Sequence, residues 1–510
     1  RPPQPFRCDG HLPGSSIALE SGSRPIDPQA SGPSAIVPER CTSARSEVKA
    51  GATPLKANPY GANRILAGMK HLVLGKAVTS VLGIGTLLMV VRGLPIPEFA
   101  AYSVMFGIMD ILLVATSVGA HQILTRYVPE VYALHYGRAL RQLLAWTLGI
   151  RFLVLVACLG AIAALIGTFS SLIGLSDWQP VLKWYLLVVF FRTVSLTHFQ
   201  VLEATLSQAR GQGAFAVATL LKFLAVGYLY ATGRLNLTSL IIAEIGAEAV
   251  GALLMTLGVA SISARRSADP TTMSDESDWL RRNKERILVF GIKGYFQNIV
   301  IMPFSGMFNR LVVGSQLPVP QIAIFGFAQT ILDLMLRYLP AQLFAGMVRP
   351  VMAARFSMSG SFTEVQTISN AALRINLVLV GLVAVAVVSG GGDMLLLVSN
   401  QKYGGEVSAL ITLMCLLGAL ESWRHVLDQI SHTVERYGFL VFSNSLLGSS
   451  VLLGLMLIPS LGIYALPLAN CLGLVCANVM VTLWLRRTGY RYDLDNKGLL
   501  IVLLATLIAA

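Results

Sequence analysis

The sequence has few charged residues. Asp, Glu, Lys and Arg make up 13% of its 510 residues, and the mean hydropathy is +0.67. Soluble domains carry about 25% charged residues, so this chain has too little polar surface to cover a water-soluble globule. The shortage of charge excludes a soluble enzyme.

Several chemical signatures are also missing. The chain has no GxxxxGK[ST] loop for nucleotide phosphates, no HExxH, no GxSxG, and no CxxC pair among its six cysteines. These absences argue against an ATPase, a hydrolase and a metal centre, and we predict neither a cofactor nor a metal site. The longest polar segment after residue 68 is 260–287, whereas a lipid-processing membrane enzyme would usually carry a larger polar loop.

Long apolar runs are what the sequence does have. A run of about 20 residues is long enough to cross the hydrocarbon core as a helix. The runs predict an all-α integral membrane protein with about twelve complete transmembrane helices, at 72–91, 99–124, 143–166, 180–202, 214–230, 237–259, 288–313, 322–348, 371–388, 407–428, 439–458 and 464–485. A thirteenth run begins at Leu499 and is cut short by the end of the sequence.

The loops carry the net charge of +13 unevenly. Alternate loops on one side hold 18 Lys and Arg residues, and those on the other side hold four: Arg92, Lys183, Arg234 and Lys402. The positive-inside rule places the richer side and the N-terminus in the cytoplasm. Since the basic residues follow this topology, nucleic acid is not an expected partner.

The polar segments divide the chain. Residues 1–68 are rich in Pro, Gly, Ser and Arg, and we interpret them as a disordered leader or as sequence upstream of the native start. Residues 69–259 form a predicted N-lobe of six helices, 260–287 a cytoplasmic linker, and 288–485 a C-lobe of six helices. Residues 486–510 are a loop and the truncated thirteenth helix.

The two lobes repeat each other in sequence. Leu94-Pro95-Ile96-Pro97 matches Leu317-Pro318-Val319-Pro320, an offset of 317 − 94 = 223, and the same offset relates Asp110 to Asp333, Arg126 to Arg349, and Arg151 to Arg374. Six helices separate the matches, so both lobes enter the membrane in the same direction. Parallel repeats of this kind are typical of transporters that move one half against the other.

Charged residues inside the predicted spans are candidates for function. Each costs at least about 2.5–3.5 kcal/mol to insert, so it should face a protein interior or an aqueous cavity. The deep cations predict a cavity that attracts an anion, and Arg binds phosphate through two hydrogen bonds. The expected substrate-binding cations are Arg151, Arg192, Lys222, Arg310 and Arg374.

The buried acids leave two interpretations open. Glu244 and Glu248 lie four residues apart on one helix face, where they would bind a proton or Na⁺ or pair with Lys222 or Arg192. Asp110 and Asp333 would either pair with a nearby Arg or contact the substrate or ion.

The segment Leu94-Pro95-Ile96-Pro97-Glu98-Phe99-Ala100-Ala101-Tyr102, with Gly119 and Thr125-Arg126-Tyr127-Val128-Pro129-Glu130, resembles the opening of polysaccharide transporters. These belong to the multidrug/oligosaccharidyl-lipid/polysaccharide exporter (MOP) superfamily and include O-antigen flippases. The family usually has glycine where this chain has Ala100. The resemblance implies two six-helix lobes around a central cavity. It also implies translocation of undecaprenyl-diphosphate-linked oligosaccharides across a bacterial inner membrane for surface polysaccharide (lipopolysaccharide) synthesis.

The expected partners are therefore an anionic lipid-linked oligosaccharide, membrane lipids, and other polysaccharide assembly proteins, with Na⁺ or H⁺ as coupling ion. Two transporters of the same superfamily stay open as alternatives: a cation-coupled multidrug exporter and a lipid II flippase. A membrane polysaccharide polymerase is the alternative from another class, and the six-helix repeat argues against it.

Overall fold

The computed structural model describes residues 62–133, 136–267, 279–339, 361–403, 405–434 and 438–493. Within these ranges every regular element is a helix. Eleven segments are long and apolar enough to cross a membrane, and one of them, Phe439–Arg487, contains two helices. The described part therefore holds twelve spanning helices, as the apolar runs predict, and the protein is a multi-pass membrane protein.

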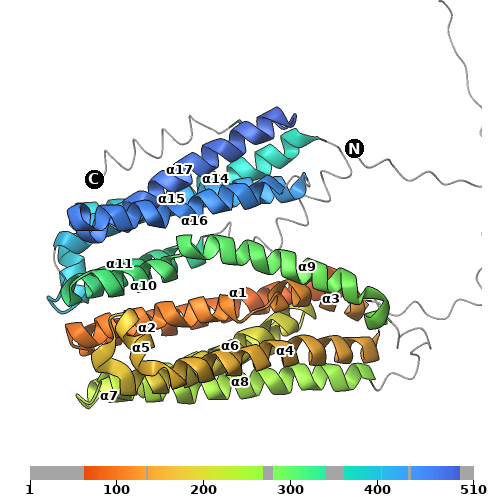
Figure 1. The fold of residues 1–510 in the computed structure, drawn as a ribbon, viewed down its shortest axis with the longest axis horizontal. Helices are drawn as coiled ribbons and strands as arrows, with labels where there is room; N and C mark the ends of the chain where they lie inside the picture. The colour runs from red at the N-terminus through yellow and green to blue at the C-terminus, as the bar shows by residue number, and fades with distance from the viewer. Residues whose placement is uncertain are drawn as a thin grey trace, which may run out of the picture. The chain divides into compact units, whose positions relative to one another are not determined.

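The first half of the chain packs as a bundle (Figure 1). Helix α1 lies against α7, while α6 and α7 both lie against α8. Its helices are α1 (Ala62–Gly93), α2 (Ile96–Ala115), α3 (Ala120–Ala133), α4 (Gly137–Ala164), α5 (Ile166–Leu172), α6 (Gln179–Ala204), α7 (Gln208–Ala231) and α8 (Leu237–Ser267).

The second half forms its own set of helix pairs. Helix α14 packs on α15, α15 packs on α17, and α16 packs on α17. The helices are α9 (Trp279–Ile301), the 3₁₀ helix η4 (Met302–Phe304), α10 (Gly306–Gln316), α11 (Val319–Tyr338), α14 (Phe362–Val398), α15 (Gly405–Thr433), α16 (Gly438–Leu461) and α17 (Ala465–Arg487).

The helix predicted at 288–313 is interrupted in the structure. Pro303 has no backbone N–H to continue a helix, and η4 occupies this position between α9 and α10. The new helix is capped by Ser305, whose hydroxyl accepts a hydrogen bond of 3.3 Å from the amide of Phe308. A hydropathy pattern does not detect this break because the residues on both sides are equally apolar.

The helix predicted at 99–124 is also two helices. Val118 and Gly119 have left-handed backbone conformations, with φ of 44° and 77°, and they turn the chain between α2 and α3. A side chain at position 119 would collide with the backbone of Gly291 in α9. Glycine is needed here both for its φ and for the close approach of the two halves.

Two side chains cover the exposed carbonyl groups at the C-terminal end of α2. The hydroxyl of Tyr295, on α9, donates to the carbonyl of Ala115 at 2.7 Å. The guanidinium of Arg151, on α4, lies 3.4 Å from the carbonyl of Leu113. Both halves of the chain therefore supply hydrogen-bond donors to the end of α2.

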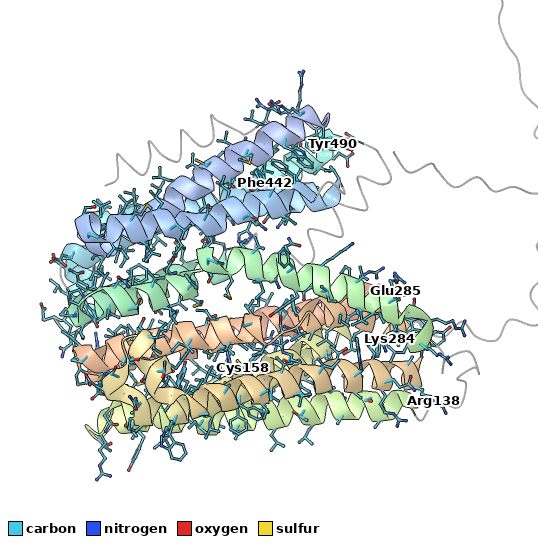
Figure 2. The ribbon with its side chains drawn as sticks, in the orientation of Figure 1. Arg138, Cys158, Lys284, Glu285, Phe442 and Tyr490 are labelled. Carbon is cyan, nitrogen blue, oxygen red and sulfur yellow. The ribbon has the colours of Figure 1, made fainter. Side chains whose placement is uncertain are left out.

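Helices extend into segments that the sequence analysis assigned elsewhere. Helix α1 begins at Ala62, inside the predicted leader, and α8 and α9 extend into the predicted linker as far as Ser267 and from Trp279. The thirteenth helix predicted from Leu499 lies outside the described residues. Arg138, Lys284 and Glu285 lie near one end of the helices, which we call the linker end (Figure 2).

Helices α2 and α11 correspond under the predicted repeat. Each has 20 residues, each follows a proline at its N-cap, and their first residues are 319 − 96 = 223 positions apart. The two helices pack directly against one another. The predicted repeat thus places equivalent helices at the junction of the two halves.

Candidate functional site: a charged cavity between the two halves

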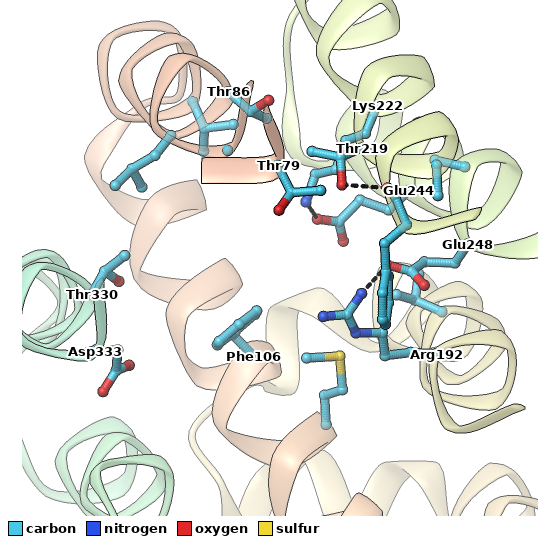
Figure 3. A pocket seen from close by; sticks show the side chains of 18 of the residues that line it. Thr79, Thr86, Phe106, Arg192, Thr219, Lys222, Glu244, Glu248, Thr330 and Asp333 are labelled. Atoms are coloured by element: carbon cyan, nitrogen blue, oxygen red, sulfur yellow. Dashed lines mark hydrogen bonds and ion pairs between the residues drawn. The ribbon is translucent and has the colours of Figure 1, made fainter. Parts of the chain in front are cut away.

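A cavity of about 380 Å³ lies between the first half and helices α10 and α11 of the second. Most of its wall comes from α1, α2, α6, α7 and α8. Figure 3 shows Arg192, Lys222, Glu244 and Glu248 on one side of the cavity, Thr330 and Asp333 on the other, and Phe106 between them. The cavity is therefore built from residues more than 250 positions apart in the sequence (333 − 76 = 257 between Lys76 and Asp333).

The wall formed by the first half contains two ion pairs. Arg192 on α6 binds Glu248 on α8 at 2.9 Å, and its guanidinium lies 5.6 Å from the ring centre of Phe215. Lys222 on α7 binds Glu244, which is 4% exposed. One helical turn separates the two glutamates, so α8 presents both to the cavity.

Tyr102 completes this wall. Its hydroxyl donates to the same Glu244 oxygen that Lys222 binds. Tyr102 and Phe106 are four residues apart on α2 and both line the cavity. Tyr102 belongs to the motif that resembles polysaccharide transporters, but it was not among the predicted site residues. The sequence does contain a pattern that predicts it. Tyr102, Phe106 and Asp110 follow one another at intervals of four residues, which puts three non-aliphatic side chains along one helix face.

The opposite wall is organised by Arg310 on α10, which is only 2% exposed. Its guanidinium donates to Asp333 and to the hydroxyl of Thr330, both at 2.9 Å, and lies 5.1 Å from the ring centre of Phe106. The amide of Gln329 donates to the other oxygen of Asp333, at 2.9 Å. The charge of Arg310 is thus held by a carboxylate, a hydroxyl and an aromatic ring.

The charges in the cavity nearly balance. Four cations line it, Lys76, Arg192, Lys222 and Arg310, against three acids, Glu244, Glu248 and Asp333, which gives 4 − 3 = +1. Three of the cations are already paired with these acids. An anion that binds Arg192, Lys222 or Arg310 would therefore have to displace a carboxylate, and a cation that binds one of the acids would have to displace an ammonium or guanidinium group.

Three of the proposed site residues do not line this cavity. Arg151 is 3% exposed and directed at the end of α2, and its Nε and Nη1 have no hydrogen-bond acceptor. Arg374 is exposed on α14. Asp110 is half-buried on α2, with an electrostatic interaction with Arg192. Arg192, Lys222, Arg310, Glu244, Glu248 and Asp333 all line the cavity.

No metal centre is evident in the part of the chain that the structure describes. Among these residues, no three His, Cys, Asp or Glu side chains come together closely enough to hold a metal ion. A further acid, Glu421 on α15, interacts electrostatically with Asp333. The site is therefore one of paired charges.

The motif that includes Tyr102 also helps to assemble the first half. Glu98, at the start of α2, accepts a hydrogen bond of 2.5 Å from the amide of Leu237, the first residue of α8. This carboxylate caps a helix N-terminus, where negative charge is favoured. Since Tyr102 then reaches Glu244 on the same helix, the motif fixes α8 against α2 at two levels.

Comparison with known proteins identifies the fold. No family model and no curated protein matches the sequence, but solved structures do match. An inward-facing multidrug resistance MATE family transporter of the MOP superfamily aligns with a TM-score of 0.63 and 13% identity, covering 80% of this chain and 94% of its own.

Two further structures give the same result. The lipid II flippase MurJ, in an inward closed conformation, aligns with a TM-score of 0.61 and 11% identity over 86% of this chain and 90% of its own. The MATE multidrug transporter DinF-BH, solved as a complex, aligns with a TM-score of 0.58 and 14% identity over 86% and 98%. This chain therefore has the same fold as these MATE and MurJ structures, and the narrower resemblance to polysaccharide transporters stays a prediction.

Proposed function

We propose that this protein is an alternating-access transporter that moves a lipid-linked, diphosphate-bearing oligosaccharide across the membrane, from the cytoplasmic to the periplasmic face of a bacterial inner membrane. The observation that carries the proposal is the cavity between the halves, where Arg192, Lys222 and Arg310 converge. Its walls come from both halves, so a movement of one half against the other changes access to it.

A diphosphate matches the donors of this cavity. The two guanidinium groups each offer a planar pair of N–H donors, and phosphate oxygens accept such pairs. The aromatic rings of Phe106 and Phe215 already lie beside these guanidinium groups, and rings of this kind also pack on sugars and lipid. We propose that the diphosphate replaces Glu248 and Asp333 as the partner of Arg192 and Arg310.

Displacement of these carboxylates would couple substrate binding to the binding of an ion. A carboxylate that loses its cation inside the membrane is costly to keep charged and gains by binding a proton or Na⁺. Glu244, Glu248 and Asp333 are the groups we propose for this role. Substrate binding and ion binding would then favour one another because both release the same ion pairs.

A second candidate, export of cationic drugs, is favoured by a different observation. The cavity holds three acids and several aromatic rings, and its net charge is only +1. A cation could take Glu244 or Glu248 from its partner as easily as an anion could take Arg192. The two candidates predict opposite responses to the loss of one acid.

A variant that lacks one acid therefore distinguishes the diphosphate transporter from the drug exporter. Glu248→Gln keeps the shape of the side chain and frees the charge of Arg192. Binding of a polyprenyl diphosphate sugar to the purified protein should become tighter in this variant, because the guanidinium no longer has to leave a carboxylate. Weaker binding of a cationic dye, with diphosphate binding unchanged or weaker, would instead support the drug exporter.

A cellular experiment tests the transport itself. In a flippase-deficient strain, Arg192→Ala should abolish surface polysaccharide while membrane abundance stays normal, and Arg192→Lys should be tolerated only in part because Lys cannot bind phosphate through two parallel bonds. Arg234→Ala is the matched control, since Arg234 is an exposed arginine outside the cavity. Full activity of Arg192→Ala would remove this residue from the mechanism.

A further inference from the structure

At the end of the helices opposite the linker end, cationic side chains join the two halves. Lys402, in the turn between α14 and α15, directs its ammonium group at the C-terminal end of α1. It donates to the carbonyl oxygens of Val91, Arg92 and Leu94 at 3.1, 2.7 and 2.6 Å. An ammonium has three donors, and all three are used on backbone groups that the helix leaves without partners.

The contact is reciprocal. Arg92, from the last turn of α1, donates through Nη2 to the carbonyl of Leu397 at 3.1 Å, in the last turn of α14. Each half thus supplies the cation that covers the other half's helix end, where the helix dipole is negative. We call Arg92 and Lys402 the reciprocal caps.

The turn that carries Lys402 is strained. Asn400 and Gln401 both have left-handed backbones, with φ of 56° and 65°, although neither is glycine. Such residues cost energy and persist where their surroundings hold them in place. Here the turn directs Lys402 toward α1 and directs Tyr403 into the protein.

Tyr403 closes the space between the caps and the cavity. It is 2% exposed, its ring stacks on Phe327 of α11 with centroids 5.2 Å apart, and it lies 6.1 Å from the ring of Phe99 on α2. Phe99 is itself part of the cavity wall. The aromatic group Phe99, Phe327 and Tyr403 therefore connects the cavity wall to the turn that carries Lys402.

Close packing of α2 against α10 and α11 extends the contact between the two halves. A side chain at Gly107 would come within 2.7 Å of the carbonyl of Met307, and one at Gly326 would collide with Ser103. Small residues at these positions let the two backbones approach, as in other helix pairs within membranes. The halves are thus in contact along this end of the molecule.

We propose that Arg92 and Lys402 form a latch that holds the cavity closed on the side carrying residue 402, predicted to be periplasmic, and that this latch must break for the cavity to open there. The inference rests on the proposed alternating access. The latch is made of charge-assisted hydrogen bonds to backbone, so it depends on the two side chains and on no bound substrate.

The test measures access to the cavity. Thr86 lines the cavity and is 5% exposed, and Thr86→Cys is nearly isosteric. In a chain whose six native cysteines are replaced by alanine, a membrane-impermeant maleimide is applied from the face that labels Lys183→Cys, a position predicted to lie on the side of residue 402. Labelling is normalised to the amount of protein in the membrane.

Loss of either cap should raise labelling of position 86. Lys402→Met removes three charge-assisted bonds and should increase the labelling rate at least about tenfold, with Arg92→Met showing a smaller rise. Lys183→Met and Arg234→Met are the matched controls, because both residues are exposed cations outside the caps. If Lys402→Met is poorly inserted, Arg92→Met alone serves for the comparison.

Unchanged labelling in both cap variants would overturn the latch, and so would labelling of the unmodified reporter as fast as that of position 183. Neither measurement uses a substrate. A failure of the diphosphate and complementation experiments would therefore leave the result on the latch standing, and the two proposals can fail separately.

Discussion

The pair formed by Arg310 and Asp333 gives a prediction whose size follows from the structure. Arg310 is almost fully buried, with side-chain exposure of 1%, and Asp333 is 20% exposed. We compare three variants: Arg310→Met, Asp333→Leu, and the two changes together. Met and Leu are close enough in volume to fill much of the space that each side chain leaves.

Removing one member leaves the other as an unpaired charge in a low-dielectric site. A break of this kind costs about 3–5 kcal/mol in buried ion pairs. Thr330 and Phe106 stay beside Arg310 when Asp333 is lost, so Asp333→Leu should lie near the lower limit. Replacing both members removes the desolvation cost as well as the attraction, and the double variant should recover most of the stability.

Thermal unfolding of the purified protein in detergent measures the effect. For a chain of this length, 3–5 kcal/mol corresponds to a fall in Tm of roughly 3–5 °C, since unfolding entropy grows with the number of residues. Arg486→Met is the control, because its pair with Asp493 is exposed and should be worth about 0–1 kcal/mol. A double variant less stable than both single variants would refute this account of the pair. A stable but inactive double variant would show that the pair serves transport.

Three other measurements follow from the same geometry. Arg151→Met should leave Tm unchanged or raise it, because this buried guanidinium has two donors without acceptors; a fall as large as that of Arg310→Met would show an unrecognised partner. Tyr102→Phe should cost about 1.5–3 kcal/mol through its lost bond to Glu244, and a thermal-stability cycle with Glu244→Gln should show that the two losses do not add. Gly107→Val should lower the free energy of unfolding by about 1–3 kcal/mol, because its Cβ would press on a backbone carbonyl, and the fall should appear in Tm. Gly149→Val, at a position with no neighbour within 4 Å, should have little effect.

The number of spanning helices was predictable because membrane thickness imposes a length on every apolar run. The interruptions within them were not. Pro303 and Gly119 are both visible in the sequence, but prolines and glycines also occur in unbroken membrane helices. What makes Gly119 necessary is the backbone of Gly291, and that contact joins residues 172 positions apart (291 − 119).

The sequence predicts which site residues share a helix face, but it does not predict their partners on other helices. Glu244 and Glu248 had to share a face because four residues make about one turn. Which cation each would meet depends on helix packing, and the pairs join Lys222 to Glu244 and Arg192 to Glu248 across different helices. Arg151 shows the limit: its sequence context is as apolar as that of Arg192, yet α4 turns it toward the end of α2.

Arg151 and Tyr295, which donate hydrogen bonds to the end of α2, are synthesised at different times. The carbonyl of Ala115 cannot accept its hydrogen bond from Tyr295 until a further 180 residues have been translated. At about 5–20 residues per second, that delay is roughly 10–40 s. For this time the nascent first half lies in the membrane with one carbonyl at the α2 break lacking its final donor. A factor that binds the nascent chain during insertion therefore contacts a first half in which this hydrogen bond is missing. The bond forms once α9 has been inserted.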